Sequence, residues 1–218
     1  MTSSDADAFL AELDAQNTRA LERIGAAAAR EPAADVTVAR LLQLALRNEL
    51  EATECAAMWI ATTREVDVKL ALARQAGDEA KHFRLIQRRL GELGVDTTGF
   101  EPGPRSALLQ YLATLESTVE RVAAGQFARE ALAVVRNEEF VRFCESRGDD
   151  ATAALYRDVI QPDEHHHHEL GRELLARLAT TAETRQLARA AAGRTLELAE
   201  EIQEIARLKM GVSRAPGC

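Results

Sequence analysis

Apolar residues recur every three or four positions through most of the chain, which is typical of helices that bury one face. Straight-chain helix formers dominate and runs of β-branched residues are rare, so we expect an all-α protein. The pattern predicts helical segments over about residues 5–28, 36–62, 67–94, 106–146 (with a break at 123–126), 151–178 and 182–210.

Turn signals separate these segments. A turn is predicted at residues 31–35 and another at 146–150, and residues 95–105 form the clearest loop because they contain two glycines and two prolines. Pro162 falls inside a predicted helix and should kink it or start a new segment. We expect the tail from Gly211 to Cys218 to be loose.

Long helices joined by short turns favour an antiparallel bundle. We expect residues 1–218 to form one domain, in which two helical pairs within about residues 36–178 make the core. The helices at 5–28 and 182–210 should pack outside this core.

The formal net charge of -8 disfavours a broad nucleic-acid surface, which needs positive charge. The three cysteines are far apart and form no C-x-x-C pair, which argues against a zinc knuckle or a disulfide scaffold and fits a reducing compartment. The first residues resemble no secretory signal, and no apolar run approaches the roughly 20 residues of a membrane span. We therefore expect a cytoplasmic protein that does not bind membranes.

Two segments carry the pattern Glu-x-x-His, one at Glu79 and His82 and one at Glu164 and His167. Residues three apart leave the same face of a helix, so each pair can reach one metal ion. A carboxylate beside an imidazole suits first-row ions such as iron, manganese or zinc. Each pair lies in a largely apolar stripe, which should face the bundle interior, where an unpartnered carboxylate is costly.

Each motif helix follows a helix with a glutamate at the same height. Glu49 and Glu79 lie about equally far from the turn near residues 64–65, so antiparallel packing brings them level. Glu130 is similarly placed relative to Glu164 across the turn near Gly148. The other nearby acidic residues fall on other faces or at other levels. These are Glu51, Glu54, Glu138 and Glu139.

A glutamate followed by Glu-x-x-His, present twice, resembles the ferritin-like di-iron carboxylate superfamily (rubrerythrin, bacterioferritin and single-chain di-iron hydroxylase types). The resemblance covers about residues 36–178 and implies a ferritin-like antiparallel four-helix bundle with additional N- and C-terminal helices. It also implies two iron ions, although the same ligands bind manganese. The implied ligands are Glu49, Glu79, His82, Glu130, Glu164 and His167, with the two motif glutamates as bridges.

Asp78 and Asp163 each precede a motif glutamate. They resemble the outer aspartates that hydrogen-bond a ligand histidine in many relatives and so fix its tautomer. Residues 165–168 form a run of four histidines inside the second motif. His167 keeps the three-residue spacing, while His168 is the alternative ligand if the helix rotates at Pro162.

The resemblance implies an oxidase or oxygenase that activates O2 to oxidise or hydroxylate a small organic substrate, with no catalytic residue beyond the metal ligands. Some similar hydroxylases act on tRNA bases, but the acidic charge disfavours tRNA. One alternative is a rubrerythrin-like or ferritin-like protein that scavenges peroxide or oxidises iron. A non-catalytic helical bundle is the other. We expect a small homo-oligomer, and the sequence leaves the electron donor open.

Overall fold

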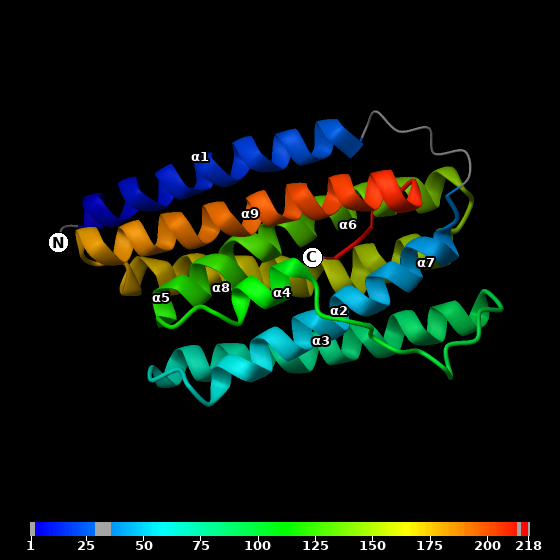
Figure 1. Cartoon of the computed structure of the whole chain (residues 1–218), viewed down its shortest axis with the longest axis horizontal. Helices are drawn as coiled ribbons and strands as arrows, with labels where there is room; N and C mark the ends of the chain where they lie inside the picture. Colours follow the sequence, from blue (N-terminus) through cyan, green and yellow to red (C-terminus); the bar gives the residue numbers. More distant parts are fainter. Residues whose placement is uncertain (1–2, 29–35, 213–214, 218) are drawn as a thin grey trace.

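The computed structural model describes residues 3–28, 36–212 and 215–217, and within these ranges all regular structure is helical, which confirms the predicted all-α class. The long helices lie side by side along one axis (Figure 1). They are α1 (Ser3–Ala28), α2 (Val38–Ile60), α3 (Val66–Glu92), α6 (Glu130–Ser146), α8 (Gln161–Leu178) and α9 (Ala182–Met210). Shorter segments are α4 (Ala107–Leu112), α5 (Thr118–Arg121), α7 (Asp150–Leu155) and two π-helical stretches, η2 (Val122–Arg129) and η3 (Tyr156–Ile160).

Two helical pairs surround the polar centre of the molecule. α2 begins where the Thr37 side chain accepts a hydrogen bond from the backbone N–H of Arg40, and it packs along α3 across a short turn. The second pair joins η2 and α6 to α8. α9 packs on η2, and α1 lies against α9 on the outside (Figure 1).

The break predicted at residues 123–126 is wrong, because these residues are buried within η2. The chain instead turns between α4 and α5, where Ser117 and Glu120 form a capping box at the start of α5. Gly125 serves a close helix contact rather than a turn, since a Cβ there would lie 2.7 Å from the Trp59 ring. The turn predicted at residues 31–35 lies outside the described residues.

Pro162 lies in the first turn of α8, directly after the π-helical stretch η3, which agrees with the expectation of a new segment there. The prediction of a loose tail is wrong for the residues described. Val212 and Gly217 are buried, the Asn48 side chain donates to the carbonyl of Pro216 at 2.9 Å, and the N–H of Gly217 donates to Asn137 at 2.8 Å. Residues 213, 214 and 218 lie outside the described part.

None of the helices in the described ranges has the length and apolar character that a membrane span requires.

Candidate metal centre

Six buried side chains meet between the two helical pairs. In one group, Glu49, Glu79, His82 and Glu164 each offer a ligand atom, and these atoms lie within 4.8 Å of one another. The second group meets the same criterion and contains Glu79, Glu130, Glu164 and His167. None of the six is more than 2% exposed. Because Glu79 and Glu164 belong to both groups, the arrangement offers two adjacent metal positions with two shared carboxylates.

These are the six residues that the sequence pattern singles out, and the helical periodicity explains how they meet. α2 supplies Glu49, α3 supplies Glu79 and His82, and Glu130 is the first residue of α6. Glu164 and His167 come from α8 and lie one helical turn apart on its buried face. That these residues bind metal stays a prediction.

Both histidines turn Nδ1 towards the carboxylates. Nδ1 of His82 lies 3.3 Å from Glu79 Oε2 and 3.5 Å from Glu49 Oε2. Nδ1 of His167 lies 3.7 Å from one oxygen each of Glu79 and Glu164. In each ring, Nδ1 is therefore the nitrogen that faces the carboxylate cluster.

The opposite ring nitrogen of each histidine contacts an aspartate of the other motif. Nε2 of His82 lies 3.1 Å from Asp163, and Nε2 of His167 lies 3.1 Å from Asp78. With its proton on Nε2, each ring donates to the aspartate and presents the Nδ1 lone pair to the centre. Asp163 also accepts a hydrogen bond from Lys81 at 2.7 Å, which anchors its carboxylate.

The polar atoms at the centre fit a pair of metal ions. Five of them are buried without a hydrogen-bond partner, namely Glu49 Oε1, Glu79 Oε1, Glu130 Oε2, Glu164 Oε2 and His167 Nδ1. Such atoms are costly in a protein interior unless something satisfies them. A set of carboxylate oxygens and imidazole nitrogens suits first-row divalent ions, so the residues present match the implied group.

Burial sets the protonation of this cluster when no metal neutralises it. Burial raises the pKa of Glu49 to about 7, and burial together with the Glu79 charge raises that of Glu164 to about 8. Burial and the neighbouring Glu164 also raise the pKa of Glu130 well above its ordinary value.

In Glu79 and His82, by contrast, the pKa shift favours the charged form. Burial would raise the pKa of Glu79, but the hydrogen bond and charge of His82 outweigh it and lower that pKa to about 2. Burial would lower the pKa of His82, but hydrogen bonds to Glu49 and Glu79 raise it to about 12. A His82 imidazolium beside an ionised Glu79 is therefore the charged pair of the metal-free cluster.

Two further residues contact the cluster and are absent from the predicted set. The Gln75 side chain donates to Glu130 Oε1 at 2.6 Å, and Arg129 Nη1 lies 3.9 Å from the same oxygen. Both are at most 3% exposed. Gln75 lies four residues before Glu79 on the buried face of α3, so its position at the edge of that apolar stripe is the signal that could have identified it.

His168 lies outside the cluster. Its Nδ1 donates to the carbonyl oxygen of Phe127 at 2.9 Å, and its ring stacks on that of Phe127. His165 is exposed to solvent. The structure thus brings His167, and not His168, into the centre.

Comparisons of the chain with protein-family models, curated proteins and solved structures find no match.

Proposed function

We propose that the chain is a ferritin-like di-iron carboxylate oxidase or oxygenase that activates O2 to oxidise a small organic substrate. The observation that carries this proposal is the pair of buried donor groups sharing Glu79 and Glu164. When bound, two ferrous ions would supply the two electrons that take O2 to the oxidation level of peroxide.

The residues of the chain would hold and orient this pair. Glu79 and Glu164 would help to hold both ions, since each lies in both donor groups. Glu49 with His82 would complete one position, and Glu130 with His167 the other. The aspartates would keep one proton of each histidine on Nε2. On metal binding, the carboxyl groups and the His82 imidazolium would release the further protons that they hold in the metal-free cluster.

Burial of all six side chains would keep bulk water away from the metal pair. A cavity next to the centre gives an organic substrate a place to bind, which favours an oxygenase over an iron-storing protein. Its lining includes Asn48 and Arg129, the sequence neighbours of Glu49 and Glu130.

Elemental analysis tests the proposal. Protein purified from iron-replete cells without chelators or a nickel column should contain about two ions per chain. A single zinc ion, or no metal, would contradict it. After anaerobic reduction, the protein should consume about one O2 per two irons.

Iron titration with gel filtration separates the oxygenase from the storage alternative. An oxygenase should saturate at about two irons per chain and stay a small oligomer. A cage-sized particle that takes up far more iron would overturn the proposed chemistry but leave the ligand assignment intact.

A further inference from the structure

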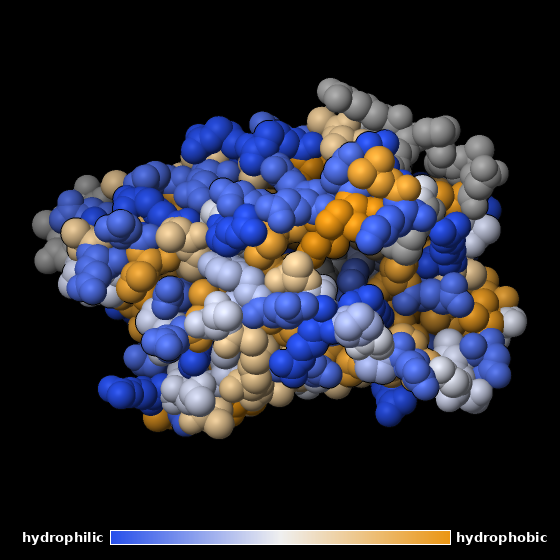
Figure 2. Space-filling view, in the orientation of Figure 1, coloured by the Kyte–Doolittle hydropathy of each residue, from blue (hydrophilic) through white to orange (hydrophobic). Residues whose placement is uncertain are grey.

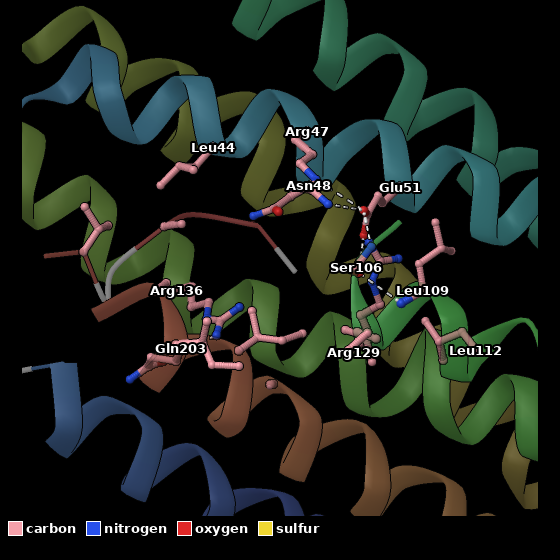
Figure 3. Close-up of a pocket in the computed structure, with 18 residues that line it drawn as sticks. Leu44, Arg47, Asn48, Glu51, Ser106, Leu109, Leu112, Arg129, Arg136 and Gln203 are labelled. Carbon is pink, nitrogen blue, oxygen red and sulfur yellow. Dashed lines mark hydrogen bonds and ion pairs between the residues drawn. The ribbon is translucent and has the colours of Figure 1, made fainter. Parts of the chain in front are cut away.

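A cavity of about 340 Å³ lies between α2, α4, α9 and the wall formed by η2 and α6 (Figure 3). This volume is in the range of small-molecule sites. In the space-filling view the face that carries α9 is hollowed near its centre, and hydrophobic residues border the hollow (Figure 2). Ile205 of α9 lines the cavity and is nevertheless 50% exposed. The cavity therefore opens to solvent beside an apolar side chain.

The inner wall of the cavity adjoins the candidate metal centre. Ala215 lines the cavity, and two residues later Gly217 packs so closely on Glu49 that a Cβ would lie 3.1 Å from its Oε1. Arg129 also lines the cavity and approaches Glu130 to 3.9 Å. A ligand here would lie within one layer of side chains from the cluster.

Most of the cavity surface is apolar. α4 contributes Leu109 and Leu112, which are at most 2% exposed, and α9 contributes Ile202 and Ala206. Leu44 of α2 extends this surface (Figure 3). These walls can bury hydrocarbon, and each buried methylene raises the affinity of a ligand about fourfold.

The polar side chains on the α2 side of the cavity are engaged within the protein. Glu51 accepts hydrogen bonds from Arg47 at 3.2 Å and from the backbone N–H of Ser106 at 2.9 Å, and the Ser106 hydroxyl also donates to it (Figure 3). The Asn48 side chain donates to the carbonyl of Pro216 at 2.9 Å. A polar ligand would have to compete with these contacts.

The polar side chains on the η2–α6 and α9 walls are engaged as well. Arg129, which is only 3% exposed, pairs with the carboxylate of Glu130 at 3.9 Å. Arg136 donates to Gln203 Oε1 at 3.4 Å, and Nε2 of Gln203 donates to the backbone carbonyl of Ile24 at 2.9 Å. The two arginines thus serve contacts within the protein and do not call for an anionic ligand.

This pairing decides the ligand class. Each polar side chain of the lining already has a partner, so a charged group that enters would lose its hydration without an equivalent contact in return. Hydrocarbon, by contrast, gains free energy when it leaves water for the apolar walls.

We propose that this cavity binds a neutral ligand through its hydrocarbon part, such as an alkyl chain, held between α4 and α9. The assignment of this ligand class as the substrate rests on the proposed function. Binding itself requires no metal, so the two ideas can be tested apart.

Calorimetric titration with hexan-1-ol, octan-1-ol, octanoate and octylammonium tests the ligand class. It is run on the protein as purified and again after chelation. In both forms octan-1-ol should bind about 15-fold more tightly than hexan-1-ol, because it buries two more methylenes. Octanoate and octylammonium should both bind more weakly than octan-1-ol, because their charged ends lose hydration. Equal affinities for the two alcohols, or binding of either ion as tight as that of octan-1-ol, would overturn the proposal.

Variants locate the site. Ala206→Phe should fill the cavity and abolish octan-1-ol binding. Leu44→Gln should weaken it about tenfold, because it places an amide in the apolar wall. Ala190→Phe is the matched control, since Ala190 is an exposed residue of α9 that lies 16 positions before Ala206, or about 24 Å along the helix.

Urea unfolding followed by circular dichroism reports whether each variant is folded. If Ala206→Phe does not fold, Leu44→Gln carries the test. Full octan-1-ol binding in the folded cavity variants, or an equal loss of binding in Ala190→Phe, would refute the assignment.

Metal analysis of the same samples separates this inference from the proposed function. Preference for octan-1-ol over both ions in protein that never acquires metal would refute only the di-iron function. Two metal ions without this preference would refute only the ligand assignment.

Discussion

Raising the pH from about 6 to about 8 should destabilise the metal-free protein. The reason is the raised pKa of Glu49, about 7, and of Glu164, about 8, both caused first by burial. Such a carboxyl group is protonated in the folded chain at a pH where the unfolded chain has already ionised it. Unfolding then releases a proton, so stability is full at low pH and is lost as the pH rises through the folded-state pKa.

The size of the effect follows from these values. One pKa unit corresponds to about 1.4 kcal/mol, so between about pH 6 and 8 Glu49 loses about 1.4 and Glu164 about 2.3 kcal/mol if they titrate independently. Because the groups interact, we expect these two carboxyl groups together to account for a loss of about 3 kcal/mol. Glu130, whose pKa is also raised, adds to this loss. The raised pKa of His82 acts in the same direction above its unfolded value. Glu79, with its pKa lowered, is ionised in both states and adds no slope.

Urea unfolding followed by circular dichroism at several pH values measures this slope. In Glu49→Gln, the loss of stability between about pH 6 and 8 should be smaller by about 1.4 kcal/mol, because one titrating group is removed. Glu51→Gln should leave it unchanged, since Glu51 lies outside the cluster and contacts Arg47 and Ser106.

Metal-loaded protein should behave in the opposite way, because metal ions compete with protons for the same oxygens. At neutral pH the metal-free protein should therefore be less stable but still folded. Metal-free stability that is flat or rises with pH would show that the carboxyl groups do not share a buried site.

Three substitutions, two of them with a comparison variant, test separate parts of the structure. Glu79→Ala should lose both ions by elemental analysis because Glu79 lies in both donor groups, whereas Glu54→Ala should keep them. Asp163→Asn should weaken metal affinity about 10–100-fold in a chelator competition, and unchanged affinity would mean that its contact with the ligand histidine has no effect on binding. Gly171→Ala should destabilise the fold by about 1–3 kcal/mol in urea unfolding, because its Cβ would lie 2.7 Å from the backbone of η2. Gly77→Ala, with nothing within 4 Å, should instead stabilise α3 by up to about 1 kcal/mol.

The sequence could predict that Glu49 lies beside Glu79, because the two features that decide this contact are local. Helical periodicity fixes which face a residue shares, and a short turn fixes the level at which two antiparallel helices meet. The same reasoning brought Glu130 level with Glu164. Sequence position therefore indicated the four glutamates and His82, and it left His168 open as the alternative to His167.

Contacts between distant segments could not be predicted in this way. Each motif histidine contacts the aspartate of the other motif, since His82 contacts Asp163 and His167 contacts Asp78. These contacts depend on how α3 faces α8, which no local sequence pattern determines. The tail was expected to be loose because terminal segments usually are. Asn48 and Asn137, which are far away in sequence, nevertheless hydrogen-bond the backbone of Pro216 and Gly217. Local sequence patterns do not indicate hydrogen-bond partners that are distant in the sequence.

The π-helical stretch η3 explains why Pro162 does not disrupt the second motif. One series of buried residues that leads into the motif is spaced by four, at Thr152, Tyr156, Ile160 and Glu164. In a regular α-helix each such step drifts by about 40°, so Glu164 would rotate away from the centre. A π turn takes in an extra residue and offsets this drift. Pro162 has no N–H to donate to the turn before it, so it does not pull that turn into tighter α geometry. The proline and the wide turn thus act together to point the Glu164 carboxylate at the cluster.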